Sequence, residues 1–376
     1  MSVLFETTII NGMSLPNRFV RSATWEGMAT TEGACTSRLA DFMANLAEGD
    51  VGLIITGHSY VSREGQAGPW QMGIHEDATL HGLTQMSEAV HRCGGKIALQ
   101  LAHAGAKAAP NLSGLEAMGA SVLKEDGKAT CREMSKEDID RIVRAFGDGA
   151  ARAKRSGFDA VEIHAAHGYL LSQFLSPLFN QRTDEYGGAL ANRGRMILEV
   201  LRSIRNAVGP NYPVLIKINS EDFMAGGFSV EEMLEFSAML ERAGIDAIEM
   251  SGGIGRDARQ LEAINYKSVR FGAISKENEG YYRDAARRFK QRIKVPLILV
   301  GGIRSLDVAE RLVGEGTADY IALSRPLICE PDLVKRWKNG DTTKSACVSD
   351  NRCFDPARRG EGMRCLLGEK TSGASR

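Results

Sequence analysis

The chain has 376 residues, a length that suits one large α/β barrel of about 250 residues with insertions, or two average domains. Basic and acidic residues both total 47, so the formal net charge is zero. Proteins that hold nucleic acid or anionic lipid electrostatically need a surplus of basic residues, so neither partner is expected. Seven cysteines in a chain of this length indicate free thiols in a reducing compartment rather than a disulfide scaffold.

Neither a targeting segment nor a membrane span is evident in the sequence. The N-terminus lacks the basic and apolar regions of a secretory signal. The longest apolar runs, 213–219 and 295–301, are the length of strands and far below the ~18 residues that a membrane helix needs. We therefore expect a cytoplasmic protein.

An N-terminal β-hairpin is the first predicted element. Asn11-Gly12 joins the short runs 7–10 and 13–15, and both central residues of such a turn must accept positive φ. Apolar strands then alternate with segments of helical periodicity. The predicted strands span residues 18–23, 51–56, 96–101, 159–163, 213–219, 246–250, 295–300 and 319–323. The predicted helices span residues 37–48, 79–93, 135–156, 192–207, 229–243, 281–292, 305–315 and 331–338.

Eight strand–helix units in sequence predict an α/β fold, a (β/α)8 TIM barrel with the N-terminal hairpin as a lid on its bottom. The strands are mostly continuous apolar runs, as expected where helices cover a parallel sheet. A doubly wound open sheet is the alternative, but no glycine-rich fingerprint follows the first strand. We assign residues 1–340 to the barrel with its hairpin and residues 341–376 to a short cysteine-containing C-terminal extension.

Several common catalytic motifs are absent from the sequence. There is no G-x-G-x-x-G after a strand, no Walker A sequence, no nucleophile elbow and no H-E-x-x-H. The kinase, serine hydrolase and zincin classes are therefore not expected.

Polar residues follow the predicted strands, at the barrel end where catalytic groups are found. This ring comprises Thr24, His58, Gln100, His103, His164, His167, Tyr169, Lys217, Asn219, Ser251, Gly301, Gly302, Ser324 and Arg325.

The densest part of the ring is His164-Ala-Ala-His167-Gly-Tyr169, after the fourth strand. Imidazole N–H groups polarise a carbonyl or nitro oxygen, and a phenol with a pKa of about 10 suits proton donation. The alternative is two core histidines satisfied by their neighbours. We expect no metal here, because no carboxylate stands at ligand spacing.

The last two strands carry a predicted phosphate site. Gly301-Gly302 follows the seventh strand and Ser324-Arg325 the eighth, and loops at these places often hold phosphate through backbone N–H groups. Arg325 adds a bidentate charge. Two ordinary turns are the alternative.

Lys217 ends an otherwise apolar strand, where its charge needs a partner. It could stabilise negative charge near N1 of a flavin. The alternative is an ion pair with Glu221 or Asp222.

Together these motifs resemble the Old Yellow Enzyme family of FMN-dependent ene-reductases, especially the barrel domain of proteins similar to 2,4-dienoyl-CoA reductase. The resemblance covers nearly the whole chain and is most specific over 164–193. It rests on residues 15–18 (LPNR), 100–105 (QLAHAG), 164–177 (HAAHGYLLSQFLSP), 180–188 (NQRTDEYGG), Arg193, Gly301-Gly302 and Ser324-Arg325.

The resemblance implies an FMN-dependent oxidoreductase that uses NADH or NADPH and reduces activated alkenes: enones, nitroalkenes or enoyl thioesters. Hydride passes to and from FMN N5. His164 and His167 hold the substrate oxygen, and Tyr169 donates the proton. The FMN contacts implied are Arg21, Ser22, Ala23, Thr24, His58, Gln100 and Lys217 at the flavin, with Gly301, Gly302, Ser324 and Arg325 at the phosphate.

The sequence departs from the family pattern at three places. Glu26 stands where many relatives place an aromatic substrate contact, so we expect it at the substrate, and Ala106 replaces a frequent arginine. Longer relatives bind a [4Fe–4S] cluster through cysteines after the barrel. Here Cys347, Cys353 and Cys365 remain, with Asp350 in place of a fourth, so we expect free thiols and no metal.

Several alternatives remain open. The chain could be a flavin-dependent amine demethylase or dehydrogenase, or a barrel subunit of a dienoyl-CoA reductase-like system. From another class comes a non-flavin phosphate-binding aldolase or isomerase. An FMN barrel acting on tRNA uridine is not favoured, because neither a catalytic cysteine near the third strand nor a basic RNA-binding appendage is visible, and the complete polar ring argues against a binding module. The expected partner is a small molecule, a homo-oligomer is one option, and Tyr266 and Phe271 in the long segment 252–280 are expected to shape the pocket.

Overall fold

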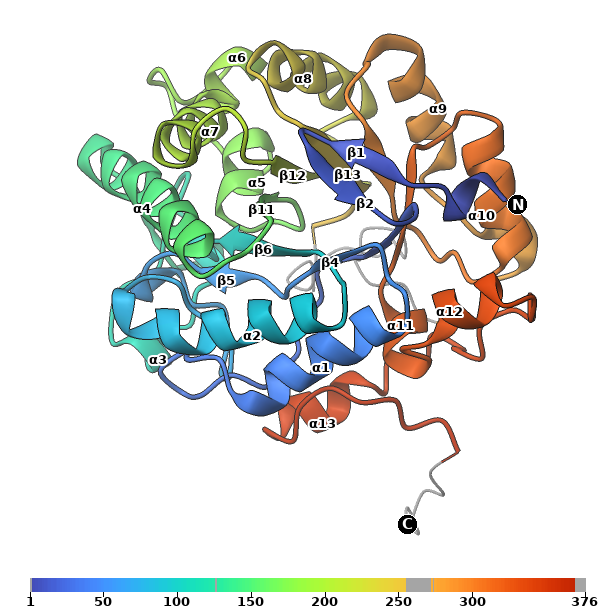
Figure 1. The fold of residues 1–376 in the computed structure, drawn as a ribbon. Helices are drawn as coiled ribbons and strands as arrows, with labels where there is room; N and C mark the ends of the chain where they lie inside the picture. Colours follow the sequence, from blue (N-terminus) through green and yellow to red (C-terminus); the bar gives the residue numbers. More distant parts are fainter. Residues whose placement is uncertain (1, 126, 255–271, 273, 369–376) are drawn as a thin grey trace, which may run out of the picture.

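The computed structural model describes residues 2–125, 127–254, 272 and 274–368 of the chain. Eight parallel strands form a closed barrel (Figure 1), because β15 pairs with β3 at one junction and β6 pairs with β11 at another. The predicted (β/α)8 barrel is therefore confirmed. Its strands are β3 (Phe19–Arg21), β4 (Leu53–Ile55), β6 (Ile97–Ala102), β11 (Ala160–Ala165), β12 (Val214–Asn219), β13 (Ala247–Ser251), β14 (Leu297–Leu299) and β15 (Tyr320–Leu323).

The eight predicted helices surround the barrel (Figure 1), and each begins and ends within three residues of its predicted bounds. Capping boxes begin two of them, at Ser135 with Asp138 and at Ser229 with Glu232, because each hydroxyl and carboxylate satisfies the other residue's backbone N–H. The helices are α1 (Ser37–Glu48), α2 (Leu80–Arg92), α4 (Lys136–Arg155), α7 (Arg195–Val208), α8 (Val230–Arg242), α9 (Arg283–Arg292), α10 (Leu306–Gly314) and α12 (Leu333–Lys338).

Short elements in the loops were not predicted, because one turn of helix or two residues of strand carry little periodicity. The short helices are α3 (Pro110–Ser113), α5 (Leu170–Leu175), α6 (Leu190–Arg193), α11 (Arg325–Cys329) and α13 (Phe354–Arg358). The short strands are β5 (Ser59–Tyr60), β7 (Met118–Gly119), β8 (Lys124–Glu125), β9 (Lys128–Ala129) and β10 (Arg132–Glu133). Single 3-10 turns are η1 (Val3–Phe5), η2 (Arg63–Gly65), η3 (Asp77–Thr79), η4 (Gly105–Lys107) and η6 (Lys276–Asn278).

The N-terminal hairpin closes one end of the barrel (Figure 1). Strands β1 (Thr8–Ile10) and β2 (Met13–Leu15) are antiparallel, and Asn11 and Gly12 between them take φ values of +40° and +79°. The hairpin's buried side chains pack against an apolar layer to which all eight barrel strands contribute. The interior at this end is therefore filled, which leaves the opposite, C-terminal end of the strands for chemistry.

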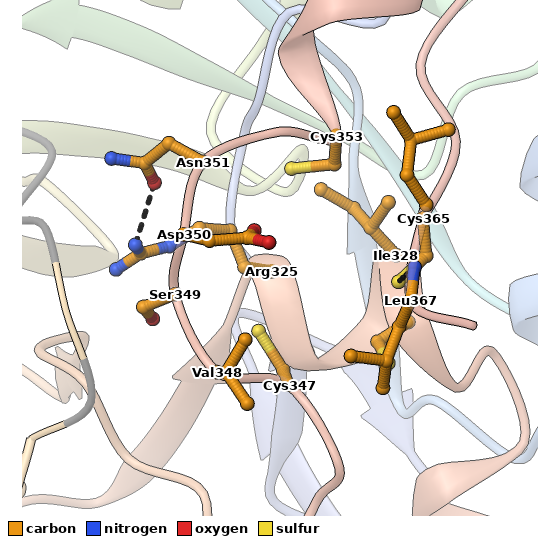
Figure 2. A pocket seen from close by; sticks show the side chains of 12 residues that line it. Arg325, Ile328, Cys347, Val348, Ser349, Asp350, Asn351, Cys353, Cys365 and Leu367 are labelled. Atoms are coloured by element: carbon orange, nitrogen blue, oxygen red, sulfur yellow. Dashed lines mark hydrogen bonds between the residues drawn. The ribbon is translucent and has the colours of Figure 1, made fainter. Parts of the chain in front are cut away.

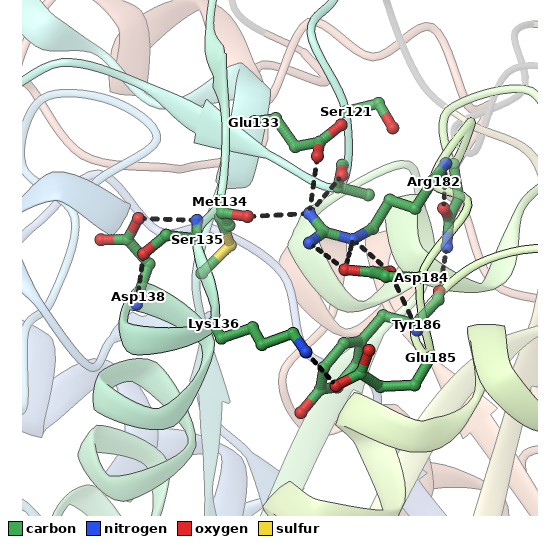
Figure 3. A network of polar contacts seen from close by, with 12 residues as sticks. Ser121, Glu133, Met134, Ser135, Lys136, Asp138, Arg182, Asp184, Glu185 and Tyr186 are labelled. Carbon is green, nitrogen blue, oxygen red and sulfur yellow. Dashed lines mark hydrogen bonds and ion pairs between the residues drawn. The ribbon is translucent and has the colours of Figure 1, made fainter.

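A buried arginine fixes the segment after α5 (Figure 3). The Arg182 guanidinium donates to the carbonyls of Ala120 and Met134 at 3.1 and 2.8 Å and pairs with Asp184 at 2.6 Å. Arg182, in the segment 180–188 on which the resemblance rests, thus ties together the loops that follow β6 and α5.

The C-terminal extension lies against the barrel. The Ser345 N–H donates to the Arg304 carbonyl at 2.9 Å, and the Met363 N–H donates to the Glu26 carbonyl at 2.8 Å. Among the described residues, no helix has the length and apolarity to cross a membrane.

Candidate active site

Four aromatic side chains meet at the C-terminal ends of the strands. The ring centroid of His164 lies 5.2 Å from that of His167, 5.1 Å from that of Tyr169 and 6.1 Å from that of His58. The rings of His58 and Tyr169 are 5.4 Å apart. The three predicted catalytic residues therefore lie together, and His58 joins them from the loop after β4.

The turn between β11 and α5 positions two of these rings. His167 and Gly168 both have positive φ, +63° and +70°, which reverses the chain so that His167 and Tyr169 face His164. The His167 N–H donates to Asn219 Oδ1 at 3.1 Å, and its Nε2 lies 2.8 Å from Ser251 Oγ. A Cβ on Gly168 would stand 2.6 Å from the Ile254 carbonyl oxygen, so this position requires glycine.

The imidazoles of this cluster are held neutral. Burial lowers the pKa of His58 to about 4, and burial, followed by nearby positive charge, lowers the pKa values of His164 and His167 well below the usual range. Among the described residues, no hydrogen-bond partner reaches the buried His58 Nε2 or His164 Nδ1. Unpaired buried nitrogens are costly, so their presence fits a ligand that hydrogen-bonds to them.

Lys217 lies in a polar layer inside the barrel, directly opposite Glu249 in the β12–β13 register. Its Nζ is 3.1 Å from Glu249 Oε2 and donates to Ser22 Oγ at 2.8 Å, and Ser22 donates to Glu249 Oε1 at 2.6 Å. The carboxylate that pairs with Lys217 is Glu249, whereas Asp222, one of the two partners considered from the sequence, accepts from Ser176, Asn219 and the Phe228 N–H. This arrangement balances the buried ammonium, and the β11–β12 register places Lys217 beside His164.

Glu162 and Glu249 are site residues that sequence reasoning missed. Gln100 Nε2 donates to Glu162 Oε2 at 2.6 Å, and burial, followed by repulsion from Glu249, raises the pKa of Glu162 well above its usual range. This shift favours the protonated form of Glu162, while Glu249 lies 3.1 Å from the Lys217 ammonium. The available signal was the near repeat of 157–163 and 244–250, which places a glutamate at the same position in two apolar strands.

Arg21 and Glu26 form a buried ion pair beside the first barrel strand. Arg21 Nη2 lies 2.9 Å from Glu26 Oε1, and the guanidinium also donates to the carbonyls of Ile55 and Thr24. Glu26 in turn accepts the Gly57 N–H at 2.8 Å. Through these contacts Glu26 links the segment after β3 to the loop after β4. They give no support to its expected role as a substrate contact.

The chain after Arg21 runs toward the predicted phosphate end. Ala23 is half-buried and packs on the inner apolar layer, and the Thr24 hydroxyl lies 2.7 Å from that of Ser324. The residues expected at the flavin edge thus contact one of those expected at the phosphate.

The glycines after β14 lie against neighbouring backbone and aromatic side chains. Gly301 and Gly302 have φ values of +141° and +72°. A Cβ on Gly302 would stand 2.5 Å from Ile274 Cδ1 and 2.8 Å from Tyr281 Cε1, so only glycine fits at position 302. The close approach leaves backbone, not side chain, at this part of the site.

Two buried arginines adjoin these glycines. Arg325 donates to Asn351 Oδ1 at 2.7 Å, and the neighbouring charge of Arg304 adds to burial in lowering its pKa. Arg304 donates to Ser349 Oγ, but its Nε has no hydrogen-bond partner among the described residues. An unpaired buried guanidinium N–H fits an anionic group such as the expected phosphate, and Arg304 is a candidate that the sequence did not suggest.

One further residue of the sequence analysis, His103, does not join the cluster. His103 is buried and accepts the Gly105 N–H at 3.0 Å through Nδ1, so it supports the loop after β6. Tyr266 and Phe271, expected to shape the pocket, lie outside the described residues.

Residues 3–344 match the model of the NADH:flavin oxidoreductase / NADH oxidase family. The NADH oxidase of Thermoanaerobacter brockii is 34% identical over 352 residues, which are 93% of this chain and 52% of that protein. The chain therefore spans about half the length of the first curated relatives that it matches.

Two solved structures are similar over nearly the whole chain. A 2-naphthoyl-CoA reductase in complex with 2-naphthoyl-CoA has a TM-score of 0.87 and 28% identity, covering 97% of this chain and 57% of that one. An Old Yellow Enzyme homologue from Zymomonas mobilis has a TM-score of 0.76 and 26% identity, covering 91% of this chain and 94% of that one.

Proposed function

Because the chain belongs to the NADH:flavin oxidoreductase / NADH oxidase family, we propose that it reduces small molecules whose C=C bond is activated by a carbonyl, nitro or thioester group. NADH or NADPH is the reductant, and FMN is the cofactor. The substrate and the partners of the whole protein are part of what we propose.

One observation carries the proposal: a neutral histidine pair stands beside a phenol, with a buried nitrogen left for a ligand. Neutral imidazoles donate hydrogen bonds to a developing negative charge on oxygen without protonating it. His164 and His167 therefore hold and polarise the substrate oxygen. Tyr169, 5.1 Å from His164 between ring centroids, is the group that donates a proton to carbon.

The residues below the cluster fit FMN. Lys217 and Gln100, each held by a glutamate, and the backbone of 21–24 would contact the flavin, while Arg304, Arg325 and the 301–302 backbone would hold its phosphate. Bound FMN supplies hydride acceptance from the nicotinamide and hydride donation to the alkene.

An enoyl or aryl thioester is the second candidate substrate. The specific observation is that the 2-naphthoyl-CoA reductase structure aligns with 97% of this chain at a TM-score of 0.87, against 0.76 for the Old Yellow Enzyme homologue.

The test uses purified protein loaded with FMN under anaerobic conditions. NADH and NADPH are each offered with an enone, a nitroalkene and an enoyl thioester, and the saturated product is quantified. We expect product from at least one of these three alkene classes, and the class reduced fastest identifies the type of substrate. Flavin reduction by nicotinamide without reduction of any alkene would contradict the proposal.

A further inference from the structure

Of the cations beside the candidate site, Arg325 contacts the C-terminal extension. Figure 2 shows its guanidinium beside Asn351, at a small cavity lined in part by cysteine side chains. No group of three His, Cys, Asp or Glu side chains in the described part of the chain could hold a metal ion. A different cation, Lys107, lies over the tyrosine of the candidate site.

Lys107 ends the 3-10 turn η4, in the loop after β6. Its Nζ lies over the Tyr169 ring, 5.8 Å from the centroid, which is within the range of a cation–π contact. The same ammonium donates to the carbonyl of His167 at 3.1 Å and to the carbonyl of Ile254. It is therefore held between the turn that follows β11 and the chain that follows β13.

The turn after β11 leaves room for this ammonium. Gly168 stands between His167 and Tyr169, and a Cβ there would lie 2.7 Å from Lys107 Nζ. Glycine at position 168 therefore lets the ammonium reach the carbonyl of His167.

Gln173 fixes the loop of Lys107 to the turn of Tyr169. Its Oε1 accepts the Ala106 N–H at 3.1 Å, and its Nε2 donates to the Gly168 carbonyl at 2.8 Å. Its own N–H donates to the Tyr169 carbonyl at 2.8 Å. Because both segments are bonded to one buried side chain, the ammonium and the phenol ring keep a fixed relation.

The histidine rings next to Tyr169 are neutral, whereas Lys107 brings a positive charge. The ring centroids of His164 and His58 lie 5.1 and 5.4 Å from that of Tyr169, and burial is the largest cause that lowers the pKa values of both imidazoles. A nearby positive charge favours the anionic form of a phenol. Two unit charges about 6 Å apart shift an ionisation equilibrium by about 10–100-fold, depending on the effective dielectric constant.

We propose that Lys107 is a positioning residue for proton transfer, because its ammonium holds the Tyr169 ring in place and stabilises the phenolate that Tyr169 becomes. This inference rests on the proposed function, in which Tyr169 is the proton donor. In that step the phenol O–H bond breaks as a C–H bond forms at one alkene carbon, and hydride adds to the other carbon. The negative charge stays on the Tyr169 oxygen until water returns the proton.

The first test needs no substrate. FMN-loaded protein that contains tyrosine labelled with carbon-13 at the ring carbon bonded to oxygen is titrated with base, and the signal missing from Tyr169→Phe identifies Tyr169. In Lys107→Met, the pH at which half of Tyr169 is ionised should rise by about one unit or more, a loss of acidity of about tenfold or more. Lys107→Arg, which keeps the charge, should restore the original value.

Lys154→Met is the matched control. Lys154 Nζ lies 5.7 Å from the centroid of the Tyr212 ring and donates to the Val208 carbonyl at 2.8 Å, so it makes the same kind of contact at another tyrosine. It should leave the ionisation of Tyr169 unchanged. Bound FMN reports folding, and if Lys107→Met loses it, Lys107→Gln, which keeps hydrogen-bond donors without the charge, takes its place.

An unchanged ionisation of Tyr169 in the uncharged Lys107 variant, or an equal rise in Lys154→Met, would overturn the proposal. The kinetic consequence is measured separately: reoxidation of the reduced flavin by an enone should slow by about tenfold or more in Lys107→Met and recover in Lys107→Arg. If the unaltered chain reduces no alkene, the proposed function fails, and the titration still decides whether Lys107 acts on Tyr169.

Discussion

At the scale of single residues, Tyr169 is the side chain whose removal separates proton donation from hydride transfer. In Tyr169→Phe, the step with an enone should slow by about 10²–10⁴-fold, the usual contribution of a positioned acid, while flavin reduction by the nicotinamide stays largely intact. Stopped-flow absorbance of the flavin measures both halves separately.

The matched control for this variant is Tyr212→Phe. The Tyr212 hydroxyl donates to the Phe158 carbonyl at 2.8 Å, and Tyr212 precedes β12 and so lies at the opposite end of the barrel. If Tyr169→Phe lowered the rates of both half-reactions equally, Tyr169 would not be the proton donor.

The depressed pKa values of the histidines predict how ligand binding depends on pH. Because burial lowers the pKa of His58 to about 4, and those of His164 and His167 well below the usual range, all three stay neutral as the pH rises through ~6.5, where an exposed histidine titrates. The dissociation constant of phenol should therefore be constant between about pH 5.5 and 8. Titration followed by the charge-transfer absorbance checks this.

His164→Ala provides the comparison. It should weaken phenol binding at every pH in this range, because it removes a hydrogen-bond donor that is already neutral. An affinity that changes with a midpoint near pH ~6.5 in the unaltered chain would contradict the neutral pair.

At the scale of elements, the register of β12 and β13 places Lys217 against Glu249 inside the barrel. Removing one member of a buried pair leaves an uncompensated charge, so Lys217→Met should lower the free energy of unfolding by about 3–5 kcal/mol. Urea denaturation measures the loss.

The double variant Lys217→Met/Glu249→Gln tests this explanation. It removes both charges, so much of the lost stability should return. Additive losses in the double variant would mean that the two side chains are not coupled.

Seven of the eight surrounding helices have nine or more residues and could be predicted from their regular apolar spacing, and a short continuous apolar run between turns marks a buried strand. Local pattern does not say which side chains meet across the barrel. Glu162 and Glu249 lie in apolar strands, and their relation to Gln100 and Lys217 follows only from strand register.

The cluster of His164, His167 and Tyr169 could be predicted because its residues are neighbours in the sequence. Its turn is local in sequence, so His164, His167 and Tyr169 could be placed together from spacing alone. His58 and Arg304 come from other loops. Glu26 follows the first barrel strand closely, but its carboxylate turned to Arg21 and Gly57, a choice that depends on packing.

At the scale of the whole molecule, the C-terminal extension and the barrel meet around two arginines. Arg304 donates to Ser349 and Arg325 to Asn351, so the residues proposed for the FMN phosphate also hold the extension. The opposite end of the barrel is filled by the hairpin and the inner apolar layer. Ligand binding at the arginines should therefore stabilise the barrel and the extension as one unit.

This arrangement predicts a difference between FMN and riboflavin, which lacks the phosphate. A ligand at a hundred times its dissociation constant stabilises the folded state by about 2.7 kcal/mol, and at equal concentrations FMN should raise Tm more than riboflavin does. Arg304→Met should remove most of that difference, because the guanidinium with an unpaired Nε no longer meets the phosphate. Arg287→Met, which changes an exposed arginine paired with Asp284 and Glu315, should leave it unchanged. Equal shifts by FMN and riboflavin in the unaltered chain would place the phosphate elsewhere and leave Arg304 to the extension alone.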